Sequence, residues 1–265
     1  MKTTEIYVIT HKRFQPLAKD SCYKPLHVGL APKGDESYQS DNTGDNISAK
    51  NPNYCELTGM YWIWKNTNPD IVGIEHYRRY FVTLSGYLRK FILGGNSGFL
   101  TEKQIRKDLV KHDAIVGKDG YIPFSKKNLV EGYDSSHHVK DILETLKIIK
   151  EKYPDYTQTV DDVFSKRAFQ PANMIICKKE LFDDYCTWLF SILEELEKRI
   201  DISDYTAYQK RVYGFIAERI FRVYLLQNKL KLKKRHIINT EDGNAFKILA
   251  KELKRFNSIT KSEHL

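Results

Sequence analysis

The densest group of ionisable side chains occupies residues 75–79, where the segment EHYRR follows the apolar run IVGI. The guanidinium groups of Arg78 and Arg79 match phosphate oxygens in a bidentate manner, and His76 can donate a hydrogen bond or coordinate. This combination predicts a phosphate-binding clamp at the end of a buried strand. The structural alternative is a salt-bridge network between Glu75 and the two arginines.

Polar residues also follow the first predicted strand. The β-prone run EIYVI at residues 5–9 precedes Thr10, His11 and Lys12. Ligands of α/β sheets bind outside the carboxyl ends of the strands, so a nucleotide is expected beside these three residues. A second short strand is predicted over residues 24–30, and a loop rich in turn-forming residues then runs to about Ala49. Long ordered loops of this kind are usually functional.

The adjacent histidines His137 and His138 precede a helix predicted over residues 139–152, with Ser135 or Ser136 as its N-cap. The positive end of a helix dipole lowers the pKa of a nearby histidine and favours neutral imidazole. A structural and a catalytic role are equally compatible with this position.

A last helix is predicted over residues 205–227, and Arg211 and Glu218 lie on one face of it, with Gly214 between them. These side chains form either an ion-pair ladder with Arg222 or part of a site.

Strands and helices alternate along the whole sequence. A helix is expected from about Asn53 to Lys65 and another over residues 180–198, with strands near residues 113–116 and 174–177. This alternation predicts an α/β fold with a mostly parallel central sheet and a helical C-terminal part. The sequence contains no GxGxxG, Walker or GxSxG motif.

The composition is that of an ordered globular protein, with 41% hydrophobic residues in a chain of 265. The four cysteines form no CxxC pair, and no run is apolar and long enough for a signal peptide or a membrane span, so a cytoplasmic protein with reduced thiols is expected. The net charge of +9 is densest at residues 229–235. It favours solubility or attraction to nucleotide phosphates or an anionic membrane, and nucleic acid is disfavoured because no aromatic residues interleave the basic run.

Five blocks of sequence, in order, carry a family resemblance: IYVITHKRF, GDNISAKNPNYCELTGMYWIWKN, IVGIEHYRRYF, NMIICKKELFDDYCTWLFSIL and QKRVYGFIAERIFRVYL. With these blocks the chain resembles a bacterial family of capsular and exopolysaccharide glycosyltransferases long catalogued as a domain of unknown function. The resemblance implies a GT-A-like, Rossmann-like nucleotide-sugar fold over residues 1–239. It also implies transfer of a hexose from a UDP-sugar, since some relatives are thought to transfer galactofuranose.

The resemblance implies roles for individual residues. GT-A enzymes usually hold a divalent metal with an Asp-x-Asp motif, and this sequence has EHYRR at the corresponding place. Glu75 and His76 could hold Mn²⁺ or Mg²⁺, but we favour direct stabilisation of the departing diphosphate by the arginines. The residues expected to bind the donor are Thr10, His11, Lys12, Asp45, Asn46, Ser48, Asn51, Glu56, His76, Arg78 and Arg79.

The catalytic base is expected to be a carboxylate or a histidine near the acceptor hydroxyl. Glu218 is the first choice, and His138 and Asp119 are the alternatives. The resemblance implies a lipid-linked glycan acceptor and an inverting reaction. A basic amphipathic segment over residues 240–265, with Phe246, Leu249, Leu253 and Phe256 on one stripe, could lie on the inner membrane surface or dock on the domain. The competing hypothesis is a non-catalytic module that binds nucleotide sugars or glycans.

Overall fold

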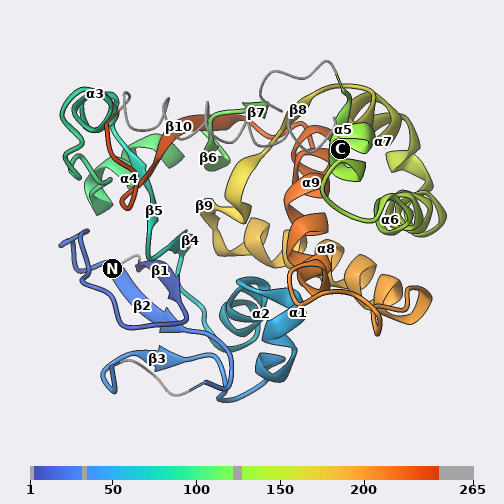
Figure 1. Ribbon diagram of the computed structural model, residues 1–265. Coiled ribbons are helices and arrows are strands. Elements are labelled where there is room, and N and C mark those ends of the chain that lie inside the picture. The colour runs from blue at the N-terminus through green and yellow to red at the C-terminus, as the bar shows by residue number, and fades with distance from the viewer. Residues whose placement is uncertain (1–2, 32–34, 122–126, 245–265) are drawn as a thin grey trace, which may run out of the picture.

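An eight-stranded mixed sheet organises the computed structural model, which describes residues 3–31, 35–121 and 127–244 (Figure 1). In spatial order its strands are β3 (Gln39–Ser40), β2 (Tyr23–His27), β1 (Thr4–Thr10), β4 (Ile71–His76), β5 (Arg79–Val82), β10 (Leu232–Asn239), β6 (Ala114–Gly117) and β9 (Ile175–Lys178). Two short strands, β7 (Gly120–Tyr121) and β8 (Ala168–Phe169), form a separate antiparallel pair.

The first four strands of this order form a parallel half-sheet. β1 pairs in parallel with β2 on one side and with β4 on the other, and Ile9 lies opposite His76 in the register. The chain moves outward from β1 to β2 and β3 and then crosses back to β4. The order of strands therefore reverses between β1 and β4, and such a topological switch point opens a crevice at the carboxyl ends of the strands.

The rest of the sheet corrects the expectation of a mostly parallel arrangement. β5, β9 and β10 take part in four antiparallel pairings, β4–β5, β5–β10, β4–β9 and β6–β9, which equal the parallel pairings in number. β4 meets β9 through Ile71–Gly73 and meets β5 only through His76, so the sheet splits along this strand. Apolar runs located β1, β2, β4, β6 and β9, but β5 and β10 were not predicted, and the described C-terminal part ends in β10 inside the sheet rather than in helices alone. Strand directions depend on long-range pairing, which apolar runs do not encode.

Helices cover both faces of the sheet (Figure 1). The α-helices are α1 (Asn51–Tyr54), α2 (Leu57–Asn66), α3 (Leu84–Leu93), α4 (Glu102–Leu109), α5 (Leu129–Asp134), α6 (Val139–Lys152), α7 (Thr157–Phe164), α8 (Lys179–Arg199) and α9 (Val212–Gln227), and the short 3₁₀ helices are η1 (Ser48–Lys50), η2 (Pro154–Tyr156), η3 (Pro171–Asn173) and η4 (Gln209–Arg211). The larger core joins α2, α6, α8 and α9 to the face of β1 and β4 that carries Ile9 and Ile74. A smaller core places α4 against the opposite face, which carries Ile6 and Ile71.

Several helix predictions hold and others need correction. The helix over 139–152 forms with those bounds, but His138 rather than a serine is its N-cap residue, and no side chain caps it. The helix expected from Asn53 breaks at Cys55 into α1 and α2, because Cys55 adopts a backbone conformation with φ of 54°. The last helix begins at Val212, after the 3₁₀ turn at 209–211, rather than at residue 205.

The basic run at 229–235 leads into β10, and part of its charge is neutralised there. Arg235 and Lys233 pair with Asp108, and Lys234 pairs with Asp119 at 2.8 Å. None of the helices in the described parts of the chain is long and apolar enough to span a bilayer. The expected apolar stripe of the C-terminal segment, Phe246 to Phe256, lies outside the described residues.

Candidate functional site

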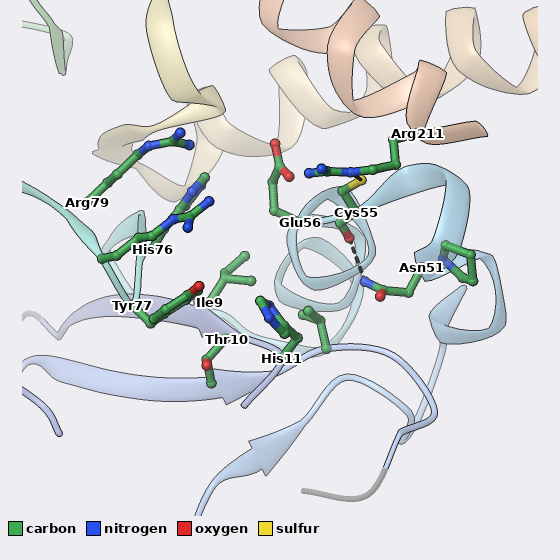
Figure 2. A pocket seen from close by; sticks show the side chains of 13 residues that line it. Ile9, Thr10, His11, Asn51, Cys55, Glu56, His76, Tyr77, Arg79 and Arg211 are labelled. Carbon is green, nitrogen blue, oxygen red and sulfur yellow. Dashed lines mark hydrogen bonds between the residues drawn. The ribbon is translucent and has the colours of Figure 1, made fainter. Parts of the chain in front are cut away.

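A cavity of about 420 Å³ opens at the switch point between β1 and β4, and we call it the strand-end cavity (Figure 2). Its lining comes from the ends of β1 and β4, the turn into β5, the segment around α1, and the 3₁₀ turn η4. The lining residues are Ile9, Thr10, His11, Val28, Asn51, Pro52, Cys55, Glu56, His76, Tyr77, Arg78, Arg79 and Arg211. Seven of the residues expected to bind a donor are therefore brought together, namely Thr10, His11, Asn51, Glu56, His76, Arg78 and Arg79.

The carboxyl end of β4 directs Glu75 and His76 to opposite faces of the sheet, as the alternation of a strand requires. Glu75 is fully buried, and one of its oxygens accepts a hydrogen bond from the Phe81 amide at 3.2 Å. Burial raises the pKa of Glu75 well above its usual range, because this single hydrogen bond does not offset the loss of water. The alternative considered for this segment, a salt bridge between Glu75 and the arginines, does not form.

His76 lies on the cavity side of β4. Burial, followed by the charges of Arg79 and Arg78, lowers its pKa to about 3. Its imidazole is therefore neutral at physiological pH, and Nε2 is buried without a hydrogen-bond partner among the described residues. A neutral imidazole with a free nitrogen can donate to or accept from a ligand without adding a charge.

Three arginines give the cavity its positive character. Arg78 pairs with Glu241 at 3.3 Å and lies over the Tyr77 ring, and both partners are partly exposed. Arg211 donates from Nε to the Cys55 sulfur at 3.1 Å. The Arg79 guanidinium group makes no hydrogen bond or ion pair with any described residue, and in Figure 2 it points into the cavity from the side opposite Arg211. An unpaired, partly buried guanidinium group such as that of Arg79 favours an anionic ligand.

The turn after β1 forms one wall of the cavity. The Thr10 hydroxyl donates to the Lys12 carbonyl at 2.5 Å and accepts from the Lys12 amide at 3.1 Å, so it holds the turn in place. Partial burial and the charges of Lys12 and Arg78 lower the pKa of His11. The His11 ring meets the edge of Tyr77 at a centroid distance of 5.4 Å. This turn therefore presents an aromatic and a neutral polar surface rather than a further charge.

The junction between α1 and α2 forms the opposite wall. Cys55 has φ of 54° and ψ of −129°, a conformation that is costly for a residue with a side chain. Asn51 stabilises it by donating from Nδ2 to the Cys55 carbonyl at 2.8 Å. The strained junction turns Glu56 toward the cavity, where it is the single acid among the lining residues (Figure 2). Strain at a site-lining residue is typical of positions that serve binding or catalysis.

Glu56 and Glu218 both hold the 3₁₀ turn η3. Glu56 accepts from Asn173 Nδ2 at 2.7 Å, and Glu218 accepts from the Ala172 amide at 2.8 Å. Ala172 and Asn173 have φ values of 74° and 47°, so two consecutive non-glycine residues adopt the left-handed conformation. The two carboxylates therefore stabilise the same strained turn.

Glu218 does not line the strand-end cavity but a second cavity of about 350 Å³. Arg79 lines both cavities, so the second cavity adjoins the first. The ion-pair ladder of Arg211, Glu218 and Arg222, one of the two alternatives for this face, does not form, since Arg211 contacts Cys55, Glu218 holds Ala172, and Arg222 pairs with Asp119.

The structure does not bring the two alternative bases to either cavity. His138 packs on the Tyr205 ring at a centroid distance of 4.1 Å. Asp119 pairs with Arg222 at 3.1 Å and with Lys234 at 2.8 Å. Burial alone would raise the pKa of Asp119, but its hydrogen bond to Lys234 and the charge of Arg222 outweigh burial and lower it. A carboxylate held by two cations is a poor proton acceptor.

Four residues expected to bind the donor also lie away from the lining. Lys12 is at the rim, where it pairs with Glu241 at 3.7 Å. Asp45 accepts from the Tyr61 hydroxyl, Asn46 caps the local turn through Ser48, and buried Ser48 bonds to Asp41. The turn-forming side chains of this loop fold it onto α2 and do not reach the cavity, because they satisfy the loop's own polar groups.

Among the described residues, no group of three or more His, Cys, Asp and Glu side chains lies close enough together to hold a metal ion. Glu75 and His76, the alternative pair named for a metal, point to opposite faces of β4. The cationic groups of the strand-end cavity are instead arginines.

The sequence pattern assigned Tyr77 and Cys55 no role, and it grouped Arg211 with Glu218 rather than with the donor-binding residues. Arg211 follows the Tyr77 region by more than a hundred residues and reaches the cavity from the 3₁₀ turn η4, directly before α9. Tyr77 lay within the ionisable cluster but was assigned no role, although its amide bonds the Ile9 carbonyl at 3.0 Å and its ring contacts His11. The position of Cys55 could not be predicted from its neighbours, because it depends on a positive φ angle that is uncommon for any residue other than glycine.

Comparison with known proteins gives two findings. Residues 5–229 match the model of a domain of unknown function, DUF4422. The solved apo structure of WbbM, a bifunctional glycosyltransferase, is similar to this chain with a TM-score of 0.78 and 31% identity. The match covers 91% of this chain and 47% of the WbbM chain, so the protein spans about half the length of that structure. No curated protein matches the sequence.

Proposed function

The chain belongs to the DUF4422 family, and from this membership and the strand-end cavity we propose that it is a glycosyltransferase that uses a nucleotide-sugar donor. The similarity to WbbM, which is a bifunctional glycosyltransferase, supports the reaction class. The donor we propose is a UDP-hexose, with UDP-galactofuranose as the first candidate from the family resemblance. The acceptor we propose is a lipid-linked glycan of a capsular or exopolysaccharide pathway.

The observation that carries this proposal is the convergence of Arg78, Arg79 and Arg211 at the switch point between β1 and β4. A nucleoside diphosphate brings two or three negative charges, and guanidinium forks bind phosphate oxygens through charge-assisted pairs of hydrogen bonds. His76, neutral and with a free nitrogen, can complete this set without repelling the arginines. Positive charge is thus available for the leaving diphosphate without a bound metal.

The chemistry follows as a single displacement. An acceptor hydroxyl forms a bond to the anomeric carbon while the bond from that carbon to the diphosphate oxygen breaks. The diphosphate leaves with the electron pair, and its added charge is met by the three arginines. We assign the acceptor's proton to Glu218, whose cavity adjoins the strand-end cavity at Arg79, and contact with the donor's sugar to Glu56.

A peripheral contact with the membrane would suit a lipid-linked acceptor, and α3 supports this part of the proposal. Leu84, Leu88, Phe91 and Ile92 lie on one stripe of that helix, and each side chain is 46% to 63% exposed. Exposed apolar stripes of this size mark interaction surfaces. The exposed Arg89 on the same helix favours an anionic surface.

Donor binding tests the function directly. Isothermal titration with UDP, UDP-glucose, UDP-galactose and UDP-galactofuranose, each with and without EDTA, should show binding of UDP compounds that survives chelation. Arg79→Ala and Arg211→Ala should each weaken UDP binding by about 10- to 100-fold, because a hydrogen bond to a charged group contributes roughly 1.5–3 kcal/mol. The matched control is Arg89→Ala, since Arg89 is exposed on α3 and lines neither cavity.

Three outcomes would count against the proposal. If no UDP compound binds, the cavity is not a nucleotide-sugar site. If binding requires a divalent cation, the arginines do not replace a metal. If UDP-sugars bind but are neither hydrolysed nor transferred to a lipid-linked acceptor, the protein is a binding module rather than a transferase.

A further inference from the structure

The second cavity has a chemical character of its own. Its polar lining comes from four separate elements, the start of β5, the loop after β6, the middle of α9, and β10. The residues are Arg79, Lys118, Glu218 and His236, with Phe169, Pro171, Ala172 and Ile237 as the apolar part. It opens beside the strand-end cavity, which it meets at Arg79.

Two cations of this cavity have no partner. Neither the Arg79 guanidinium nor the Lys118 ammonium makes a hydrogen bond or ion pair with the described part of the chain. The basic residues that follow one another on β10 are instead paired, Lys233 and Arg235 with Asp108 and Lys234 with Asp119. Arg79 is partly buried without a counter-charge among the described residues, and the exposed Lys118 ammonium lines the same cavity, so the two together favour a ligand that supplies negative charge.

His236 and Glu218 supply groups that can bind hydroxyls. The His236 ring stacks on Tyr87 with a centroid distance of 3.8 Å, which fixes its orientation. Partial burial, then the charge of Lys118, lowers the pKa of His236, so its imidazole is neutral at physiological pH. Glu218 uses Oε1 to accept from the Ala172 amide at 2.8 Å. Its other oxygen remains available for an acceptor hydroxyl.

The apolar wall suits the ring of a sugar. Phe169 is partly exposed, and the Arg219 guanidinium lies over its ring at 4.4 Å. Pro171 and Ile237 complete this side of the cavity. The C–H face of a pyranose or furanose ring can pack against such a surface while its hydroxyls face the polar side.

We propose that the second cavity binds an acceptor sugar that carries an anionic group, a carboxylate or a phosphate, through Arg79 and Lys118 beside Glu218. The role of this sugar as the acceptor rests on the proposed glycosyl transfer. The anion-binding site itself does not depend on that proposal. The acceptor hydroxyl then lies between the base and the donor's anomeric carbon. Arg79, which lines both cavities, faces the donor's diphosphate on one side and the acceptor's anion on the other.

The test compares three small probes by saturation-transfer NMR and isothermal titration, with and without saturating UDP: methyl β-glucuronide, glucose 1-phosphate and the neutral methyl β-glucoside. The wild-type protein should bind at least one anionic probe about tenfold or more tightly than the neutral probe, since a charge-assisted hydrogen bond contributes roughly 1.5–3 kcal/mol. Lys118→Gln should remove most of this preference and leave UDP binding unchanged, because Lys118 does not line the strand-end cavity. The matched control is Lys107→Gln on α4, an exposed lysine outside both cavities.

Preference for the glucuronide would identify a uronic acid as the acceptor, and preference for the sugar phosphate would identify a phosphorylated one. Equal binding of all three probes, or a preference that survives Lys118→Gln, would overturn the inference. Loss of UDP binding in every protein would instead count against the proposed function. The two failures are distinguishable because the probes are also measured without UDP.

Discussion

Two carboxylates at the site have different surroundings, and these predict different roles. Glu218 faces the second cavity with unpaired cations around it, whereas Glu56 faces the strand-end cavity between Arg79 and Arg211 (Figure 2). Glu218→Gln should lower the turnover number by about a hundredfold or more, the usual contribution of a general base. UDP affinity should stay unchanged, since the amide oxygen can still accept from Ala172.

Glu56→Gln provides the comparison. It should change the KM for the donor more than the turnover number, because we place Glu56 against the donor's sugar. Unfolding temperatures of both variants establish that the fold is intact. Near-normal transfer by Glu218→Gln would remove Glu218 as the base and make Glu56 the next residue to test.

Glu75 predicts a pH dependence of stability that has nothing to do with catalysis. Its pKa in the folded protein is well above its ordinary value of about 4.5, because it is fully buried. Below the ordinary value of about 4.5, Glu75 is protonated in both the folded and the unfolded chain. As pH rises, the unfolded chain releases it first, so stability is lost by up to about 1.4 kcal/mol per pH unit until the folded pKa is reached.

Glu75→Gln cannot ionise and should therefore gain stability relative to the wild type between pH 5 and pH 8. Urea unfolding at both pH values measures the difference. Glu194→Gln, at an exposed position on α8, is the matched control and should show no such trend. A constant difference between Glu75→Gln and wild type across this range would show that Glu75 ionises normally in the folded protein.

At the scale of elements, α3 packs on β5 and β10 through one face and leaves an apolar stripe on the other. Flotation with vesicles of phosphatidylethanolamine and phosphatidylglycerol tests whether that stripe contacts a membrane. The double variant Leu88→Ser, Phe91→Ser should reduce the bound fraction at least about tenfold, since burying each large apolar side chain contributes roughly 1.5–3 kcal/mol. Leu143→Ser on α6, which is 50% exposed, is the control.

The same experiment with a chain ending at Asn244 separates α3 from the segment that follows. If the wild type does not float, or if the double variant floats as well as the wild type, α3 is not the membrane contact. Loss of flotation only on truncation would assign the contact to residues 245–265.

Elements with a strong local pattern could be predicted from the sequence, and their assembly could not. The run IVGIEH forms the fully buried β4, and the periodic segment 139–152 forms α6, because side-chain alternation and helical spacing are local properties. The antiparallel pairing of β9 with β4 depends on contacts between residues about a hundred positions apart.

The turn after β1 and the end of β4 were expected together because parallel strands share an edge. Arg211 and Asn173 reach the site through tertiary packing, and the loop around Asp45 resembled a binding loop but satisfies its own polar groups.

At the scale of the whole molecule, the two cavities are assembled from both ends of the described chain. The strand-end cavity uses the first strand and the 3₁₀ turn η4 before α9, and the second cavity uses β10. β10 lies between β5 and β6, so the last described strand occupies the middle of the sheet. The residues that follow it continue past the strand-end cavity, where the Thr240 amide bonds the Arg78 carbonyl at 2.8 Å.

Glu241 ties this segment to the strand-end cavity, because it pairs with Lys12 at 3.7 Å and with Arg78 at 3.3 Å. A donor diphosphate would compete with this carboxylate for the same arginine. Glu241→Gln should therefore bind UDP up to about fivefold more tightly, since a partly exposed ion pair contributes at most roughly 1 kcal/mol. The gain should shrink in 1 M salt, where the Debye length falls to about 3 Å. Glu195→Gln, which breaks a surface pair with Arg199 on α8, is the control. Titration calorimetry at low and high salt measures the UDP affinity of both variants.

Weaker binding by Glu241→Gln would mean that the Glu241–Arg78 pair orients Arg78 for the diphosphate instead of competing with it. The chain after β10 would then be part of the donor site.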